Sequence, residues 1–159
     1  MYVVQLIKEK VKKPSPNPQG VTVFDYNNDG FMDIFIANRM GVNTLFENTG
    51  ISGNKYISFK LKGTTSNFEA IGTIVLLTWN NGVDAEDKIQ LREYNAQSFE
   101  SDSYGSRDSR IVFGLGQTGE PLQLEVHWPS GKKTTLTRQM LEGVPKTMNY
   151  NKIMTIIEP

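Results

Sequence analysis

Residues 25–33 read Asp25-Tyr26-Asn27-Asn28-Asp29-Gly30-Phe31-Met32-Asp33 and place side-chain oxygens at the first, third, fifth and ninth positions of a nine-residue loop. Calcium is a hard cation that takes six to eight oxygen ligands. Alternating Asp25, Asn27 and Asp29 can point inward together where the backbone turns tightly, and Gly30 permits such a turn. The spacing therefore predicts one calcium site, with ligands from Asp25, Asn27, Asp29, the carbonyl of Phe31, and Asp33.

The start of this loop also fits the calcium loop of an EF-hand, which places a bidentate Glu at its twelfth position. That position is Ile36 here, so the EF-hand interpretation is excluded. Residues 21–24 and 34–37 are rich in β-branched and aromatic side chains and predict two short strands joined by the loop. Residues 43–47 predict a third strand of the same sheet. The alternative to a metal site is a polar turn, because Asp and Asn also hydrogen-bond to their own backbone in turns.

The loop and its two strands resemble the calcium loop of FG-GAP (VCBS) repeats, which form the blades of integrin-type β-propellers. Those repeats carry Asp-x-Asx-x-Asp-Gly-x-x-Asp, and residues 25–33 match every specified position. The resemblance covers roughly residues 18–49, about one blade, whereas a propeller closes with four to eight blades. It implies that this chain is the end of a longer protein with further blades upstream, or that the single blade packs against another element.

Composition narrows the class of protein. The 159 residues include 14 Gly and 7 Pro, and Lys+Arg and Asp+Glu number 17 each. A net charge of zero argues against a dedicated nucleic-acid surface. The absence of Cys excludes disulfides and Cys-based zinc sites. No apolar run approaches the roughly 20 residues needed to span a membrane.

The N-terminal sequence predicts a boundary and a linker. Residues 1–7 form a short apolar run with charge after it, which does not match a signal peptide. We therefore expect Met1 to be an internal start, with any export signal upstream. The predicted organisation is an N-terminal strand and Pro-rich linker over residues 1–20, a calcium blade over 21–50, and a second β domain over 55–159.

From residue 55 onward, short strands alternate with turns, as is typical of a sandwich or barrel. Residues 74–79 are apolar on both faces, which favours a central strand, and the only predicted helix is a short one over 137–141. The fold class predicted is mostly β: a propeller-blade-like sheet with a calcium loop, then a β-sandwich or barrel-like domain. The remaining strands of that domain are predicted at 56–61, 88–94, 109–113, 121–128, 133–137 and 152–157.

Three stretches of the second half resemble the ASPIC/UnbV domain, which follows FG-GAP repeats in proteins of the cartilage acidic protein family and in bacterial relatives. They are residues 67–72 (Asn-Phe-Glu-Ala-Ile-Gly), 113–116 (Phe-Gly-Leu-Gly) and 126–132 (Val-His-Trp-Pro-Ser-Gly-Lys). The resemblance covers about residues 55–158 and departs at Phe68, where the family usually has Arg. It implies an extracellular or exported calcium-binding, adhesion-like module with no established catalytic chemistry, whose partner would be a protein or a glycan.

The sequence offers little for catalysis. His127 is the only histidine, and no Gly-x-Ser-x-Gly nucleophile motif accompanies it. Residues 114–119 fit Gly-x-Gly-x-x-Gly, but a dinucleotide site needs a helix after the glycines, and Pro121 with the alternating residues 122–126 predicts a strand. We therefore expect no enzyme, no catalytic residues and a structural calcium ion. The alternative is an accessory protein or enzyme component of a bacterial natural-product pathway, since some relatives are associated with such gene clusters.

Overall fold

The computed structural model describes residues 18–27, 29, 31–39, 42–50, 53–83, 86–94, 110–142 and 152–159. The chain divides into two compact units, and the described part of the first is residues 18–50, whereas the second begins at Gly53. The predicted N-terminal strand and most of the predicted linker lie outside the described residues. Among the described residues, no helix is long and apolar enough to cross a membrane.

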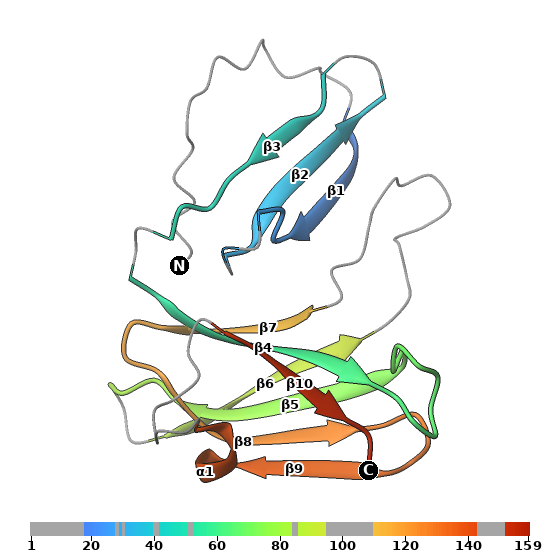
Figure 1. Ribbon diagram of the computed structural model, residues 1–159. Helices are drawn as coiled ribbons and strands as arrows, with labels where there is room; N and C mark the ends of the chain where they lie inside the picture. The colour runs from blue at the N-terminus through green and yellow to red at the C-terminus, as the bar shows by residue number, and fades with distance from the viewer. Residues whose placement is uncertain are drawn as a thin grey trace. The chain divides into compact units, whose positions relative to one another are not determined.

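The first unit contains a three-stranded antiparallel sheet in the order β1-β2-β3 (Figure 1). The strands are β1 (Pro18–Phe24), β2 (Asp33–Asn38) and β3 (Thr44–Phe46). The β-branched and aromatic residues that predicted these strands pack well on a pleated surface, and the predicted hairpin is confirmed. Strand β1 begins earlier than predicted, because a Pro is tolerated as the first residue of a strand.

This first sheet is apolar on both of its faces. The register places Val23 opposite Ile34 on one face, and Phe35 opposite Leu45 on the other. Val23 is 52% exposed and Leu45 is 41% exposed. A sheet with one solvated face would instead alternate apolar and polar side chains. The described residues of this unit therefore form a single layer with apolar side chains on each side.

The second unit is a β-sandwich-like domain of two sheets, so the predicted mostly β fold is confirmed. One sheet has the order β10-β4-β7 and the other the order β6-β5-β8-β9 (Figure 1). Strand β10 is parallel to β4, and the other pairings are antiparallel. The elements are β4 (Lys55–Lys62), β5 (Thr73–Asn80), β6 (Asp87–Tyr94), β7 (Arg110–Gly116), β8 (Glu120–His127), β9 (Lys133–Thr137), α1 (Arg138–Leu141) and β10 (Ile153–Ile157).

The core of the second unit lies between these two sheets. Phe59 on β4 and Phe113 on β7 are fully buried, and their rings meet edge to face with centroids 6.2 Å apart. From the other sheet, Leu77 and Leu124 are also fully buried, and Leu141 of α1 joins the same cluster. The predicted central strand at residues 74–79 is confirmed, since β5 lies between β6 and β8.

The glycines of residues 113–116 lie inside a strand, which corrects one sequence-based prediction. A strand ending near residue 113 was expected, but β7 continues to Gly116. Gly114 pairs with Tyr56 and Gly116 with Lys55, so the β7 side of the pairing has one extra residue, and glycine is often found in strands at such bulges. The strand predicted after Pro121 is present as β8, so residues 114–119 are not followed by the helix that a dinucleotide site requires.

In the middle of strand β6 the polar Gln90 and Arg92 face inward and the apolar Ile89 and Leu91 face outward. Gln90 Nε2 donates to the carbonyl of Gly114 at 2.9 Å, and Arg92 Nε donates to the carbonyl of Val112 at 3.3 Å. Leu91, between them, is 55% exposed. Strand β7 is the last strand of its sheet, so its outer carbonyls need donors from elsewhere. The two inward side chains of β6 supply them.

A buried carboxylate makes a second set of polar contacts in the same unit. Glu158, just after β10, is 2% exposed. It accepts hydrogen bonds from the main-chain N–H groups of Thr64, Thr65 and Ser66 and from the hydroxyls of Ser66 and Ser130. Burial raises the pKa of Glu158, but the hydrogen bonds outweigh burial and hold the pKa well below its usual range.

Replacing a core residue should be far more damaging than replacing its exposed neighbour. Leu77 on β5 is fully buried, and Leu91 on the adjacent strand β6 is 55% exposed. Leu77→Ala should lower the free energy of unfolding by about 2–5 kcal/mol through lost burial and a cavity. Leu91→Ala should change it by less than about 0.5 kcal/mol. Urea unfolding of both variants measures this, and equal losses would contradict the assigned core.

The Glu158 carboxylate should make stability depend on acid pH. The usual pKa is 4.5, and the folded pKa is lower, so its contribution is complete above about pH 4.5 and falls as the unfolded chain takes up the proton first. Measured by urea unfolding from about pH 7 to about pH 3, the free energy of unfolding should therefore fall more steeply in the wild type than in Glu158→Gln. Glu93→Gln, at an exposed position on β6, is the matched control. Parallel pH profiles for wild type and Glu158→Gln would refute this role.

Candidate metal centre

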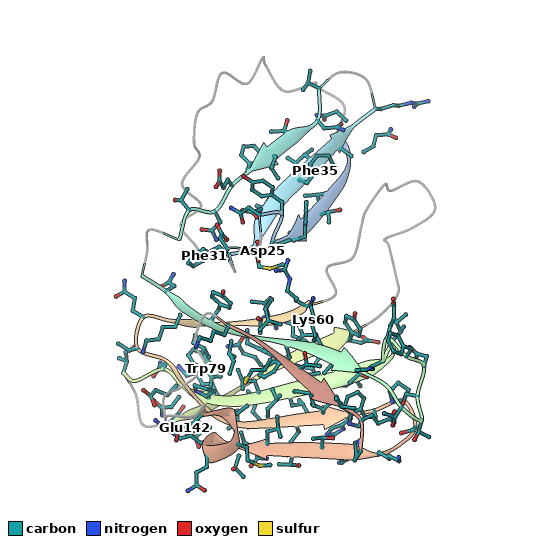
Figure 2. The ribbon with its side chains drawn as sticks, in the orientation of Figure 1. Asp25, Phe31, Phe35, Lys60, Trp79 and Glu142 are labelled. Atoms are coloured by element: carbon teal, nitrogen blue, oxygen red, sulfur yellow. The ribbon has the colours of Figure 1, made fainter. Side chains whose placement is uncertain are left out.

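The loop predicted to bind calcium joins β1 to β2 at one end of the first sheet. Figure 2 shows Asp25 and Phe31 at that end, with Phe35 farther along β2. Strand β1 ends at Phe24 and β2 begins at Asp33, so all five predicted ligands belong to the loop or to the first residue of β2. Gly30, predicted to permit the turn, lies outside the described residues.

Hydrogen bonds within the loop bring three of the predicted ligands together. The main-chain N–H of Asp29 donates to Asp25 Oδ1 and to Asn27 Oδ1, each at 3.1 Å. Asp29 Oδ1 in turn accepts from the main-chain N–H of Phe31 at 2.8 Å. Asn27 Nδ2 donates to Asp29 Oδ2 at 2.8 Å. The alternating spacing therefore places Asp25, Asn27 and Asp29 around one tight turn.

Asp33 is held separately by the main chain. It is fully buried, and its two carboxylate oxygens accept from the N–H of Tyr26 at 3.0 Å and of Asn48 at 2.7 Å. Burial raises the pKa of Asp33, the hydrogen bonds from Asn48 and Tyr26 lower it, and the nearby charges of Asp29 and Asp25 raise it again. The net pKa is above its usual value, so the negative charge on this carboxylate is poorly compensated.

Residues that follow β3 also reach the loop, and the loop spacing alone could not reveal them. Asn48 donates to Asp33, as described, and Asn27 Nδ2 donates to Glu47 Oε1 at 3.4 Å. A Cβ built at Gly50 would overlap the ring of Phe31, and Gly50 has a φ of +64°. The turn-forming sequence Asn-Thr-Gly at residues 48–50 is the only signal in the sequence that points to these contacts.

The donors fit calcium in type, because they are carboxylate, amide and carbonyl oxygens. A carboxylate offers about four acceptor positions, so Asp29 and Asp33 can each accept more than the two hydrogen bonds described. Among the described residues, however, no group of three or more His, Cys, Asp or Glu side chains is arranged to hold a metal ion. The hydrogen bonds are also those of the polar turn that was the alternative prediction.

The single histidine is on β8 of the second unit. His127 Nε2 lies 3.2 Å from Glu125 Oε2, and the two residues are on the same face of the strand. This hydrogen bond is the main reason why the pKa of Glu125 is lowered. Both side chains are about one-third exposed, at 31% and 37%. His127 and Glu125 therefore form a partly exposed hydrogen-bonded pair within strand β8.

Comparison with known proteins concerns mainly the second unit. A family model described as ASPIC and UnbV matches residues 63–143, which run from the end of β4 to just beyond α1. The match includes all three of the sequence stretches that suggested this resemblance. No curated protein matches the chain.

The contact between Gly50 and Phe31 can be tested with a matched pair of substitutions. Gly50 and Gly53 have φ values of +64° and +66°. Replacing either with Ala should therefore destabilise the backbone by a similar amount, about 1–2 kcal/mol. Only at Gly50 does the new Cβ meet another side chain, whereas nothing lies within 4 Å at Gly53. Gly50→Ala should therefore lower the free energy of unfolding by about 1–3 kcal/mol more than Gly53→Ala does. It should also speed amide hydrogen exchange at Phe31 and Asp29. Equal amide exchange in both variants would contradict the packing of Phe31 beneath Gly50.

Proposed function

Because the chain belongs to the ASPIC and UnbV family, and because an Asp-rich loop precedes the matched region, we propose that it is a calcium-binding, non-catalytic interaction module. In this proposal the ion is held by Asp25, Asn27, Asp29, Asp33 and the carbonyl of Phe31. The module is extracellular or exported, and its partner is a protein or a glycan. The first sheet is a blade of the FG-GAP (VCBS) type, as in proteins of the cartilage acidic protein family.

The observation that carries the proposal is the convergence of oxygens around Asp29. Two side-chain oxygens, from Asp25 and Asn27, lie 3.1 Å from the same main-chain nitrogen. The Asp29 side chain lies within 2.8 Å of the Asn27 amide. Three hard donors on alternating residues are thus gathered around one turn, as the ligands of a single cation must be. Donors that are ordered before binding lower the entropic cost of binding.

The electrostatics of the loop support a structural role for the ion. Asp33 is fully buried and lies within the electrostatic range of Asp25 and Asp29. Like charges that are partly removed from water repel one another, because the effective dielectric constant is lower there. A bound cation would offset this repulsion and fix the β1–β2 connection. The flanking Phe24 and Phe31 are apolar, which is consistent with a stabilising ion that performs no chemistry.

The two apolar faces of the first sheet support its assignment as a blade. A propeller blade is covered on both faces by its neighbours, and such a sheet needs apolar residues on both sides. Val23 and Ile34 provide one such face, and Phe35 and Leu45 provide the other. We therefore infer that further blades of a longer protein cover this sheet. An accessory or enzymatic role in a natural-product pathway is the alternative, and calcium-dependent catalysis would favour it.

Calcium titration of the metal-depleted chain tests the site. Isothermal titration should give one site with a Kd on the order of 10⁻⁴–10⁻³ M, as in extracellular modules. Asp29→Ala should abolish the binding heat, because Asp29 contributes a carboxylate and organises the turn. At a hundredfold excess over Kd, calcium should raise the free energy of unfolding by about 2.7 kcal/mol.

Glu93→Ala is the control, since it removes an exposed carboxylate from the second unit. It should bind calcium as the wild type does. A far-UV circular dichroism spectrum unchanged from the wild type is required of Asp29→Ala before its titration is interpreted. Equal calcium binding by wild type and Asp29→Ala would overturn the ligand assignment, and unchanged melting with calcium-dependent hydrolysis would overturn the structural role.

A further inference from the structure

The Glu158 carboxylate lies in a site composed only of hydrogen-bond donors. Its Oε2 accepts from three consecutive main-chain N–H groups, those of Thr64 at 2.7 Å, Thr65 at 2.8 Å and Ser66 at 2.7 Å. Its Oε1 accepts from Ser66 Oγ at 2.9 Å and from Ser130 Oγ. Consecutive amides that converge on one oxygen form a nest, which is an anion-binding concavity of the backbone.

The carboxylate is carried by an extended segment that lies along a sheet edge. Strand β10 pairs in parallel with β4, from Ile153 opposite Ser58 to Ile157 opposite Lys62. The main-chain pairing continues past the strand, because the N–H of Glu158 donates to the carbonyl of Lys62 at 2.9 Å. Strand addition of this kind is a common mode of peptide recognition, in which the main chain supplies affinity and a few side chains supply specificity.

Few side chains of this segment enter the domain. Ile156 is 6% exposed and belongs to the core cluster, and the partly buried Met154 packs against that cluster, whereas Ile153 and Ile157 are 44% and 56% exposed. After the carboxylate, the main-chain oxygen of Pro159 accepts from Lys132 Nζ at 2.6 Å. The segment therefore docks through its backbone, two apolar side chains, one carboxylate and one contact with a cation. These are the features of a bound peptide ligand.

The groups that donate to the carboxylate belong to the family-matched region, whereas strand β4 and the segment itself do not. The matched residues 63–143 contain the amide nest, Ser130 and Lys132. Strand β10 and Glu158 follow that region. The two donor loops also brace each other, because the N–H of Ser130 donates to Ser66 Oγ at 3.1 Å, and Lys132 Nζ donates to Thr65 Oγ1 at 2.9 Å. The donors are therefore held in place partly by contacts that do not involve the segment.

We propose that the edge of β4 and the amide nest of residues 64–66 form a peptide-binding groove for an extended segment that carries a carboxylate, and that residues 152–159 occupy this groove as an intramolecular ligand. The same groove accepts an identical segment supplied in trans when the resident segment is weakened. The carboxylate sets specificity, because three amides and two hydroxyls would be left without an acceptor if an apolar side chain entered instead.

Peptide binding to the full chain tests this proposal. The probe is a fluorescein-labelled peptide of residues 152–159, Lys-Ile-Met-Thr-Ile-Ile-Glu-Pro, followed by fluorescence anisotropy. It should bind the Glu158→Ala chain at least about tenfold more tightly than it binds the wild type, whose own segment competes more strongly. A peptide with Gln in place of the Glu should bind the Glu158→Ala chain at least about tenfold more weakly than the Glu peptide.

Glu93→Ala is again the matched control, and it should bind the probe as weakly as the wild type. Absence of saturable binding to a folded Glu158→Ala chain, or equal binding of the Glu and Gln peptides, would overturn the proposal. If Glu158→Ala does not fold, hydrogen exchange of the wild type decides. Amides of β10 and of residues 64–66 should then exchange at least about tenfold faster than those of β5 and β8. Equal exchange would show that β10 is an integral strand of the core and not a bound ligand.

Discussion

The apolar contact between the two sheets of the second unit is the interaction on which that unit depends. Phe59 and Phe113 from one sheet and Leu77 and Leu124 from the other are all fully buried in a single cluster. Neither a three-stranded nor a four-stranded sheet can bury both of its faces alone. The remaining features of the unit follow from this contact, because a sandwich leaves strand edges and chain ends whose polar groups need partners.

Those polar partners are what the sequence could not reveal. The apolar residues of β5 and β8 predicted their strands correctly, because burial of one or both faces leaves a direct pattern in the sequence. Strand β6 shows the opposite arrangement, since Gln90 and Arg92 face inward to bond the carbonyls of β7, and Leu91 faces solvent. Glu158 reaches the amides of residues 64–66 across 92–94 positions of sequence. Periodicity carries no information about either contact, because each depends on which edges the folded sheets bring together.

The candidate metal loop shows the same division between local and distant contacts. Alternation of Asp25, Asn27 and Asp29 predicted that their side chains would share one turn, and their hydrogen bonds gather around the Asp29 amide. Asp33 was predicted as a ligand from spacing alone, whereas its hydrogen bond from the main-chain N–H of Asn48 comes from the chain after β3. Loop spacing specifies which oxygens are near one another, but the surroundings decide how strongly their charges interact.

The two units therefore differ in what they need for stability: partners for polar groups in the second unit, and cover for apolar faces in the first. The second unit satisfies two carbonyls of its β7 edge with side chains of β6 and the amides of residues 64–66 with its own Glu158, and its apolar side chains form one buried cluster. The first sheet has apolar side chains on both faces, of which Val23 and Leu45 remain 52% and 41% exposed. A cation at the loop can relieve repulsion among carboxylates, but it removes no apolar surface from water. An ion would consequently order one end of this sheet, while burial of its faces requires contact with further apolar surface.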